Sequence, residues 1–392
     1  MSIWGLSGSG RLIRKERCWT ESPPTSPCSL RTESGAFQSG LVSRVSCLKH
    51  PYRHPRMHSA EFSYALPPEA IAQEAIEPRD AARLLVARTL EDRSFTDLPG
   101  LLEPGDLVVV NNTRVRPARV HAMKETGGRV ELLLTKQVTA TTWEALVRPA
   151  RRIRPGSELT VGPLTMVVVT EPDRGVVTLE VSPERSVDDV LRELGEVPLP
   201  PYFHGNLDDD ERYQTIFARA VGSAAAPTAA LHFTPRIVRA LHARNIGIVD
   251  VELEVGLDTF RPMEDGPISD HEMHEERYTV PVATADAIAE TKLRESRVVA
   301  VGTTVVRTLE TAAEPDGGVQ PGSGSTELFI TPGFRTRVVD ALVTNFHAPG
   351  TTLIVMIAAL VGPTWREVYA HALGSGYRFL SFGDAMFIEV DQ

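Results

Sequence analysis

The chain has 392 residues, enough for two or three domains, with 42% hydrophobic and 23% charged residues, as in ordinary globular proteins. Its formal net charge of −10 disfavours non-specific nucleic-acid binding, so any RNA contact requires a local basic patch. All three cysteines lie within residues 1–56, which excludes a disulfide framework, a Cys-ligated zinc site and an iron–sulfur cluster from residues 57–392.

The first 56 residues are rich in Ser, Gly, Pro and Arg and show no sustained periodicity, so we expect them to be disordered. Met57 precedes the first organised sequence and is a plausible true start; a transit peptide is the alternative. No apolar run reaches the roughly 18–20 residues of a membrane span. The longest, 353–361, predicts a buried helix, and we expect a cytoplasmic protein without a membrane partner.

Residues 62–106 predict a short α/β entry with a strand at 83–87. Short alternating segments separated by Gly, Pro and Asp turns then favour a barrel or sandwich. These strand candidates are 107–110, 118–123, 129–135, 142–147, 158–161, 164–170 and 176–181.

From residue 186 strands alternate with helices, which implies a mostly parallel sheet covered on both faces. The predicted helices are 187–194, 213–221, 234–244, 283–294, 303–313, 351–361 and 365–373, and the strands are 248–255, 297–301 and 337–345, with a strand-like end at 377–390. The predicted fold is a discontinuous α/β domain (57–106 and 186–392) with an inserted small β-barrel domain (107–185).

A basic stretch runs from residue 113 to 154. It favours a phosphate-contacting face on the barrel, although a solvated barrel exterior is also charged. The stretch contains Arg114, Arg116, Arg119, Lys124, Arg129, Lys136, Arg148, Arg151, Arg152 and Arg154, opposed by Glu125, Glu131 and Glu144.

The segment 270–275 (DHEMHE) contains candidates for general acid/base catalysis near neutral pH, namely His271, His274 and Glu275. A helix would place the two histidines on one face. The segment lacks the H-E-x-x-H spacing of zinc proteases, and we predict no metal. A polar loop with solvated histidines is the alternative.

Polar residues at two strand ends are candidates for ligand binding. Thr303 and Thr304 follow an apolar strand and open a helix, where an anion or a ribose binds readily; a simple helix cap is the alternative. Asn345 and His347 end the next strand.

Two further segments contain candidates. Residues 213–234 suit adenine or ribose recognition through Tyr213, Gln214, Thr228, His232 and Phe233, although periodicity alone favours helix packing. Arg378 and Asp384 suit a buried pair or a substrate clamp.

Motifs in a fixed order over most of the chain now indicate a family. They are FSYALPPEAIAQ (62–73), RLLV (83–86), PGDLVVVNNTRVRPARV (104–120), GGRVELLL (127–134), WEALVRPARR (143–152), PLPPY (198–202), YQTIFA (213–218), GSAAAPTAALHFT (222–234), TFRPM (259–263), HEMH (271–274), RVVAVGTTVVRTLE (297–310), TELFITPGF (326–334), VDALVTNFHAPGTTL (339–353) and YRFLSFGDAM (377–386). With these motifs the chain resembles the S-adenosylmethionine:tRNA ribosyltransferase-isomerase family of the queuosine pathway.

The resemblance implies an α/β domain with an inserted β-barrel and S-adenosylmethionine as co-substrate, with no metal. It implies transfer and isomerisation of the ribosyl group onto 7-aminomethyl-7-deazaguanine at the tRNA wobble position, giving epoxyqueuosine, adenine and methionine. The partner would be the tRNA anticodon stem-loop, and we expect a monomer or weak homo-oligomer.

The activity that the resemblance implies assigns a role to each candidate residue. The catalytic candidates are His271, His274, Glu275 and His232. The donor-binding candidates are Tyr213, Gln214, Thr228, Phe233, Thr303, Thr304, Asn345, His347, Arg378 and Asp384. The tRNA-binding candidates are Arg114, Arg119, Lys124, Arg148, Arg151 and Arg152.

The chain departs from the usual family pattern at Ala230 and Asp258, where glycine is usual, at Ala348, where leucine is usual, and at Asn112 in the N-D-T-R motif. Two alternatives therefore stay open: a divergent paralogue that uses S-adenosylmethionine on another nucleobase or a small molecule, and a non-catalytic RNA-binding protein.

Overall fold

The computed structural model describes residues 57–183, 186–205, 207, 209–256 and 261–390. The predictions for residues 1–56 and for Asp258 lie outside these residues.

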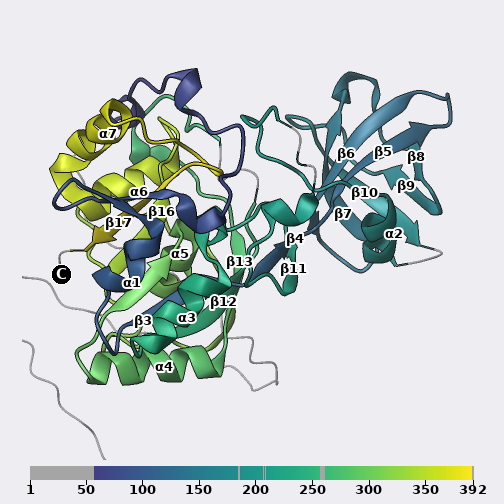
Figure 1. Ribbon diagram of the computed structural model, residues 1–392. Helices are drawn as coiled ribbons and strands as arrows, with labels where there is room; N and C mark the ends of the chain where they lie inside the picture. The colour runs from purple at the N-terminus through teal and green to yellow at the C-terminus, as the bar shows by residue number, and fades with distance from the viewer. Residues whose placement is uncertain (1–56, 184–185, 206, 208, 257–260, 391–392) are drawn as a thin grey trace, which may run out of the picture. The chain divides into compact units, whose positions relative to one another are not determined.

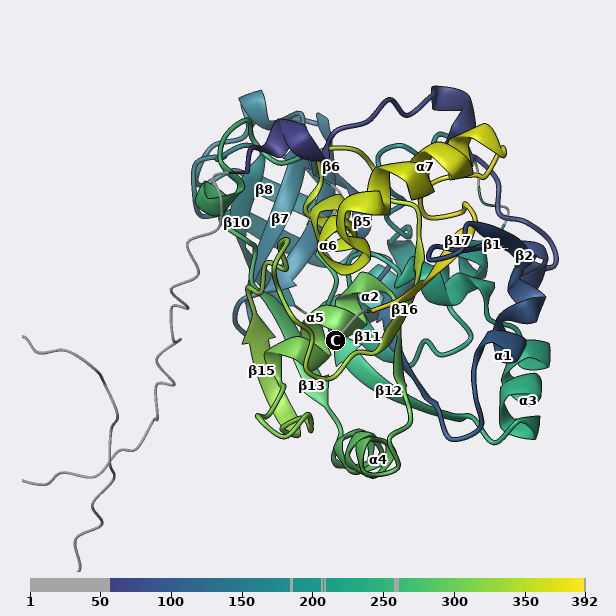
Figure 2. The ribbon, with the colours of Figure 1, turned by 90° about the vertical axis from the view of Figure 1, so that its left-hand side faces the viewer.

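Nine of the described strands form one mixed sheet, in the order β15-β13-β12-β3-β14-β16-β17-β1-β2. Figure 2 shows it from β15 at one edge to β2 at the other. The central strands β12, β3, β14 and β16 pair in parallel, as do β17 and β1, while β15, β13, β2 and the β16–β17 pair are antiparallel. The strands are β1 (Arg83–Val86), β2 (Glu91–Ser94), β3 (Leu107–Asn111), β12 (Gly247–Leu253), β13 (Glu276–Val280), β14 (Val298–Val301), β15 (Gly322–Thr326), β16 (Ala341–Asn345) and β17 (Ala385–Glu389).

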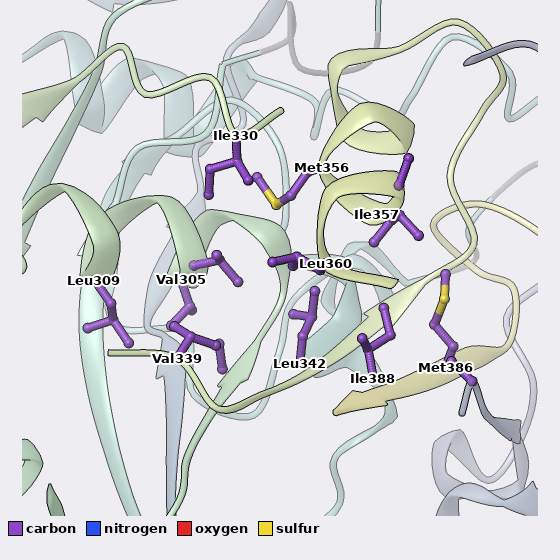
Figure 3. Close-up of a cluster of buried hydrophobic side chains, with 14 of the residues drawn as sticks. Val305, Leu309, Ile330, Val339, Leu342, Met356, Ile357, Leu360, Met386 and Ile388 are labelled. Carbon is purple, nitrogen blue, oxygen red and sulfur yellow. The ribbon is translucent and has the colours of Figure 1, made fainter. Parts of the chain in front are cut away.

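Helices cover both faces of this sheet because consecutive residues of its central strands are apolar, so both faces are hydrophobic. Leu107, Val298 and Leu342 pack with α4 (Val282–Leu293), α5 (Thr303–Thr311), α6 (Thr352–Val361) and α7 (Trp365–Gly374). Their neighbours Val108 and Val299 pack with α1 (Leu98–Leu101) and α3 (Pro235–Ala243) on the other face. Figure 3 shows Val305 and Leu309 of α5 beside α6, which lies over Leu342 of β16 and Ile388 of β17, and this packing fixes the position of α5.

Six further strands close into an antiparallel barrel in the order β10-β7-β6-β5-β8-β9 (Figure 1). They are β5 (Arg119–Lys124), β6 (Arg129–Gln137), β7 (Thr142–Arg148), β8 (Glu158–Val161), β9 (Leu164–Val168) and β10 (Val176–Pro183). Their inward side chains, with Trp143 fully buried, form a separate hydrophobic cluster. The short strand β4 (Thr113–Val115) lies between β3 and β5 in the sequence and pairs in parallel with β11 (Ala220–Ser223).

Short 3-10 helices join these elements. They are η1 (Ser59–Phe62), η2 (Pro68–Ala70), η3 (Arg79–Ala81), η4 (Phe95–Asp97), η5 (Ala150–Arg152), η6 (Asp210–Tyr213), η7 (Thr228–His232), η9 (Ile268–Asp270) and η10 (Gly362–Thr364).

The predicted fold class is confirmed, since an α/β unit with a parallel centre accompanies a closed barrel. Both predicted domain boundaries need correction. Residues 107–110, assigned to the barrel, form β3 in the centre of the sheet, where they are buried on both faces. The helix α2 (Val187–Leu194), assigned to the α/β domain, buries Val187, Val190 and Leu191 in the barrel cluster.

The helix predicted at 213–221 is also wrong. Its residues form the end of η6, an irregular segment and the start of β11. Phe217 packs against the core, with its ring centroid 5.5 Å from that of Phe233, whereas Ile216 and Val221 are exposed.

One helical run among the described residues, Thr352–Gly374, is long and apolar enough to cross a membrane by length and composition alone. It comprises α6, η10 and α7, and 56% of its most apolar stretch is buried inside the protein. The predicted buried helix at 353–361 corresponds to α6, whose Leu353 to Ala358 side chains all lie in the core.

Candidate functional site

Two adjoining cavities lie where β14 and β16 end. We call the first the strand-end cavity; its empty volume, including the part open to solvent, is about 610 Å³. The second, the loop cavity, has a corresponding volume of about 1900 Å³ and is bounded chiefly by residues 261–274, 328–330 and the first turns of α5 and α6. Thr303, Thr304 and Leu353 line both cavities. The start of α5 therefore forms their common wall.

The turn from β14 into α5 depends on Gly302, which has a φ of 93° and caps the helix without a side-chain hydrogen bond. Its own amide donates to Val343 O at 2.8 Å, which ties the turn to β16. The hydroxyl of Thr304 is buried and has no hydrogen-bond partner in the described part of the chain. Thr303 and Thr304 line both cavities, and their binding of a ligand stays a prediction.

Asn345, only 3% exposed, joins three segments at the strand-end cavity. Its Oδ1 accepts from Thr228 Oγ1 at 2.9 Å, while its Nδ2 contacts His232 Nε2 at 3.3 Å and donates to Asp384 O at 3.4 Å. Thr228 and Asn345 both line the cavity. Asn345 therefore links β16 to η7 and to the turn before β17.

His347 also lines the strand-end cavity, with its Nε2 3.0 Å from Thr344 Oγ1. Tyr64 donates to its carbonyl at 2.5 Å. Burial lowers the pKa of His347 to about 3, so the imidazole is neutral at physiological pH.

His232 lies behind Asn345 and does not line this cavity. Its ring packs on Phe95 with centroids 5.0 Å apart. Burial lowers its pKa to about 4, against a smaller opposing effect of Asp384. It faces a small separate hollow shared with Arg79 and Phe382, so its contact with the reacting atoms would be indirect.

His271 and His274 line the loop cavity, but they do not lie on a helix. His271 ends η9, and the chain then runs without regular structure to β13. Burial, and next the charge of His274, lowers the pKa of His271, whose ring contacts Phe329. Glu275 instead is exposed and faces Lys136, with Oε2 3.7 Å from Nζ.

Sequence reasoning missed a buried ion pair in the loop cavity, between Glu276 of β13 and Arg307 of α5, each 5% exposed. Glu276 also accepts from the amide of Gly256 at 3.1 Å, and Arg307 donates to the carbonyls of Leu328 and Thr326. The available signal was an arginine close in sequence to the apolar residues Val305, Val306 and Leu309 of a predicted helix.

Five predicted donor-binding residues line neither cavity. Phe233 is in the core behind the sheet, and Tyr213 packs on Phe382. Gln214 hydrogen-bonds the backbone of Val115 in both directions.

The other two of these residues are Asp384 and Arg378. Asp384 accepts from the amides of Arg83 and Arg378, and its carboxylate lies 3.6 Å from the Arg378 guanidinium. The predicted pair is therefore present, with Asp384 buried and Arg378 half-buried, and a clamp on a ligand stays a prediction.

The predicted tRNA-binding residues divide into two groups. Arg114 is paired with Glu211, and Arg119 is half-buried at the start of β5. Lys124 donates to Arg152 O at 2.8 Å, next to the exposed side chains of Arg148, Arg151 and Arg152. None of these three arginines forms an ion pair with a described residue. Around η5 the barrel therefore presents uncompensated positive charge.

Ala230, one of the departures from the family pattern, is fully buried in the core and lines neither cavity, whereas its neighbour Ala229 does line the strand-end cavity. Ala348, another departure, lines the strand-end cavity. No group of three or more His, Cys, Asp or Glu side chains within the described ranges is arranged to hold a metal ion.

Comparisons with known proteins agree on one family. Curated relatives named S-adenosylmethionine:tRNA ribosyltransferase-isomerase come from Symbiobacterium thermophilum (47% identical over 340 residues), Pelotomaculum thermopropionicum (47% over 343) and Moorella thermoacetica (48% over 341). Each alignment covers 85% of this chain and 100% of the relative. A crystal structure of S-adenosylmethionine tRNA ribosyltransferase from Thermotoga maritima is 38% identical, with 84% of this chain and 99% of that chain covered and a TM-score of 0.48.

The family model described as "Queuosine biosynthesis protein" matches residues 59–388, which include every segment of both cavities and the whole barrel. The chain therefore belongs to the queuosine biosynthesis protein family.

Proposed function

We propose that this chain transfers and isomerises the ribosyl group of S-adenosylmethionine onto 7-aminomethyl-7-deazaguanine at the wobble position of tRNA. The products are epoxyqueuosine in tRNA, adenine and methionine. The observation that carries this proposal is family membership along residues 59–388, with curated relatives of the same name aligned over their full length.

The two adjoining cavities supply a suitable arrangement for a donor and an acceptor. The strand-end cavity is lined by hydroxyl, amide and apolar side chains with no charged residue among those described, which suits the adenine and ribose of the donor. The loop cavity is about three times larger and is lined by histidines, carboxylates and arginines, which suits an extruded tRNA base. The ribosyl group would pass from one to the other across Thr303 and Thr304.

The reaction needs a base for a proton beside the sulfonium and a proton donor for the departing adenine. We assign these roles to His271 and His274, because both line the loop cavity. The lowered pKa of His271 keeps it neutral, and thus able to accept a proton, at physiological pH. Glu275 faces Lys136, so its proposed role is to hold the segment in place.

The exposed arginines around η5 are our proposed contact with the phosphates of the anticodon stem-loop. Arg148, Arg151 and Arg152 have no ion-pair partner in the described part of the chain, so their charge is available to RNA. Arg114 is committed to Glu211 and would contribute less. A tRNA substrate also implies a reaction in the cytoplasm.

The test is adenine release from labelled S-adenosylmethionine, with tRNA that carries the precursor base. We expect release that depends on this base, and none with unmodified guanine in its place. Absence of release with both tRNAs would contradict the proposal and favour a paralogue with another acceptor.

The acid/base assignment is tested in the same assay with His271→Ala and His274→Ala. We expect losses of about 100-fold or more in kcat for the variant that lacks the base. Unchanged turnover of both variants would show the assignment to be wrong.

A further inference from the structure

The first turn of α5 presents hydrogen-bond donors that have no acceptor. The amides of Thr303 and Thr304 begin the helix and have no acceptor among the described residues. Gly302 provides no side-chain cap. The Thr304 hydroxyl, on a side chain 6% exposed, is also without a partner although it lines the cavity. A buried polar group usually has a hydrogen-bond partner, which at a cavity wall is ordered water or a ligand.

The electrostatics of this turn favour an anion. The aligned peptides of a helix place a partial positive charge of about half a unit at its N-terminus. No described residue that lines the strand-end cavity carries a formal charge at neutral pH, because burial keeps His347 neutral. Packing of Val305 and Leu309 against α6 and the sheet holds α5 rigidly, so the donors are in place before a ligand arrives (Figure 3).

The two amides and the hydroxyl are three hydrogen-bond donors without acceptors, and they match a ligand group that only accepts hydrogen bonds. A carboxylate does so, whereas ribose hydroxyls both donate and accept. A tRNA phosphate lies on a wide polynucleotide backbone, and the deep burial of Thr304 favours a narrow group instead.

From these contacts we infer that the first turn of α5, Gly302 to Thr304, binds the carboxylate of the methionine moiety of the donor. The inference rests on the proposed function for the identity of the donor. The amides of Thr303 and Thr304 and the Thr304 hydroxyl donate to the carboxylate oxygens. This contact places the sulfonium and its ribose at the junction of the two cavities, since Thr304 lines both.

The test is calorimetric binding of S-adenosylmethionine and of its decarboxylated analogue, with tRNA that carries unmodified guanine so that no transfer is expected. We expect the unaltered protein to bind S-adenosylmethionine at least tenfold more tightly, since a hydrogen bond to a charged group has this effect. Thr304→Val should weaken S-adenosylmethionine binding by about tenfold and leave binding of the analogue within about twofold. Thr304→Ser, which keeps the hydroxyl, should restore the preference.

Thr336→Val is the matched control, because Thr336 also has a buried hydroxyl without a partner but lines neither cavity. It should bind both compounds like the unaltered protein. Equal affinity of the unaltered protein for both donors, or an equal loss for both in Thr304→Val, would overturn the inference. Binding is measured without turnover, so a failure of adenine release in the earlier assay would not change the outcome of the binding test.

Discussion

Replacement of Asn345 by leucine, compared with a matched control, tests two effects of this residue: its contribution to the stability of the fold and its contribution to the shape of the cavity proposed to bind the donor. Leucine has the branched shape of asparagine but no hydrogen-bonding group. It removes the contacts from Asn345 to Thr228, His232 and Asp384 O, at 2.9, 3.3 and 3.4 Å. All three partners belong to segments distant in sequence.

The expected loss of unfolding free energy follows from these distances. A buried hydrogen bond contributes a net ~0.5–1.5 kcal/mol, and two of the three are long, so the total is about 2–3 kcal/mol. With a urea dependence of about 3 kcal/mol per molar, the unfolding midpoint should fall by about 1 M. Thr228 loses its anchor on the cavity wall, so donor affinity should also fall, by about tenfold.

Asn111→Leu is the matched control. Asn111 is fully buried at the end of β3 and also makes three hydrogen bonds, one to Leu253 O and two from the amides of Thr113 and Leu253, yet it lines neither cavity. It should lower the urea midpoint similarly and leave donor affinity unchanged.

Urea unfolding followed by circular dichroism and calorimetric donor binding measure the two effects. An unchanged midpoint for Asn345→Leu would refute the energetic argument. Equal losses of donor affinity in both variants would refute the role of Asn345 in shaping the cavity.

Three further predictions follow from buried or uncompensated charges. The pKa of His232 is about 4 in the folded protein against 6.5 in the unfolded chain, so His232 contributes about 3 kcal/mol to the free energy of unfolding above pH 6.5, and this contribution is lost as pH falls towards 4. His232→Gln should therefore flatten the dependence of stability on pH in this range, and an unchanged dependence would contradict the prediction. Arg307→Met should destabilise the protein by about 3–5 kcal/mol in urea unfolding, because it removes the cation from a buried pair, whereas Arg294→Met, at an exposed pair, should cost under about 1 kcal/mol. Arg151→Ala with Arg152→Ala should weaken tRNA binding and reduce its salt dependence while donor binding is unchanged; an unaltered salt slope would exclude phosphate contact.

Local sequence patterns were sufficient to predict the α/β elements around the site. The apolar run 297–301, followed by Gly-Thr-Thr, predicted a strand and a helix, and β14 and α5 occupy these positions. Because ligands bind at the carboxyl ends of parallel strands, Thr303, Thr304, Asn345 and His347 could be proposed as site residues without knowledge of the pairing. All four line the strand-end cavity.

Local patterns failed where an apolar segment could pack in more than one place. Residues 107–110 suit a barrel or a sheet equally, and only their pairing with β12 and β14 assigns them to the sheet. Phe217 and Val221 fit a helical period, but their segment runs into the β4–β11 pair.

By itself the sequence determined the fold class, the family and the strand ends where we propose that a ligand binds, because each depends on short-range periodicity or on motifs in order. Tertiary structure decided which polar side chains face a cavity. His232 and Asn345, 113 residues apart, are in contact, and only Asn345 lines the strand-end cavity. Glu276 and Arg307, 31 residues apart, meet inside the protein. Burial and partner choice depend on packing between distant segments, which no local pattern encodes.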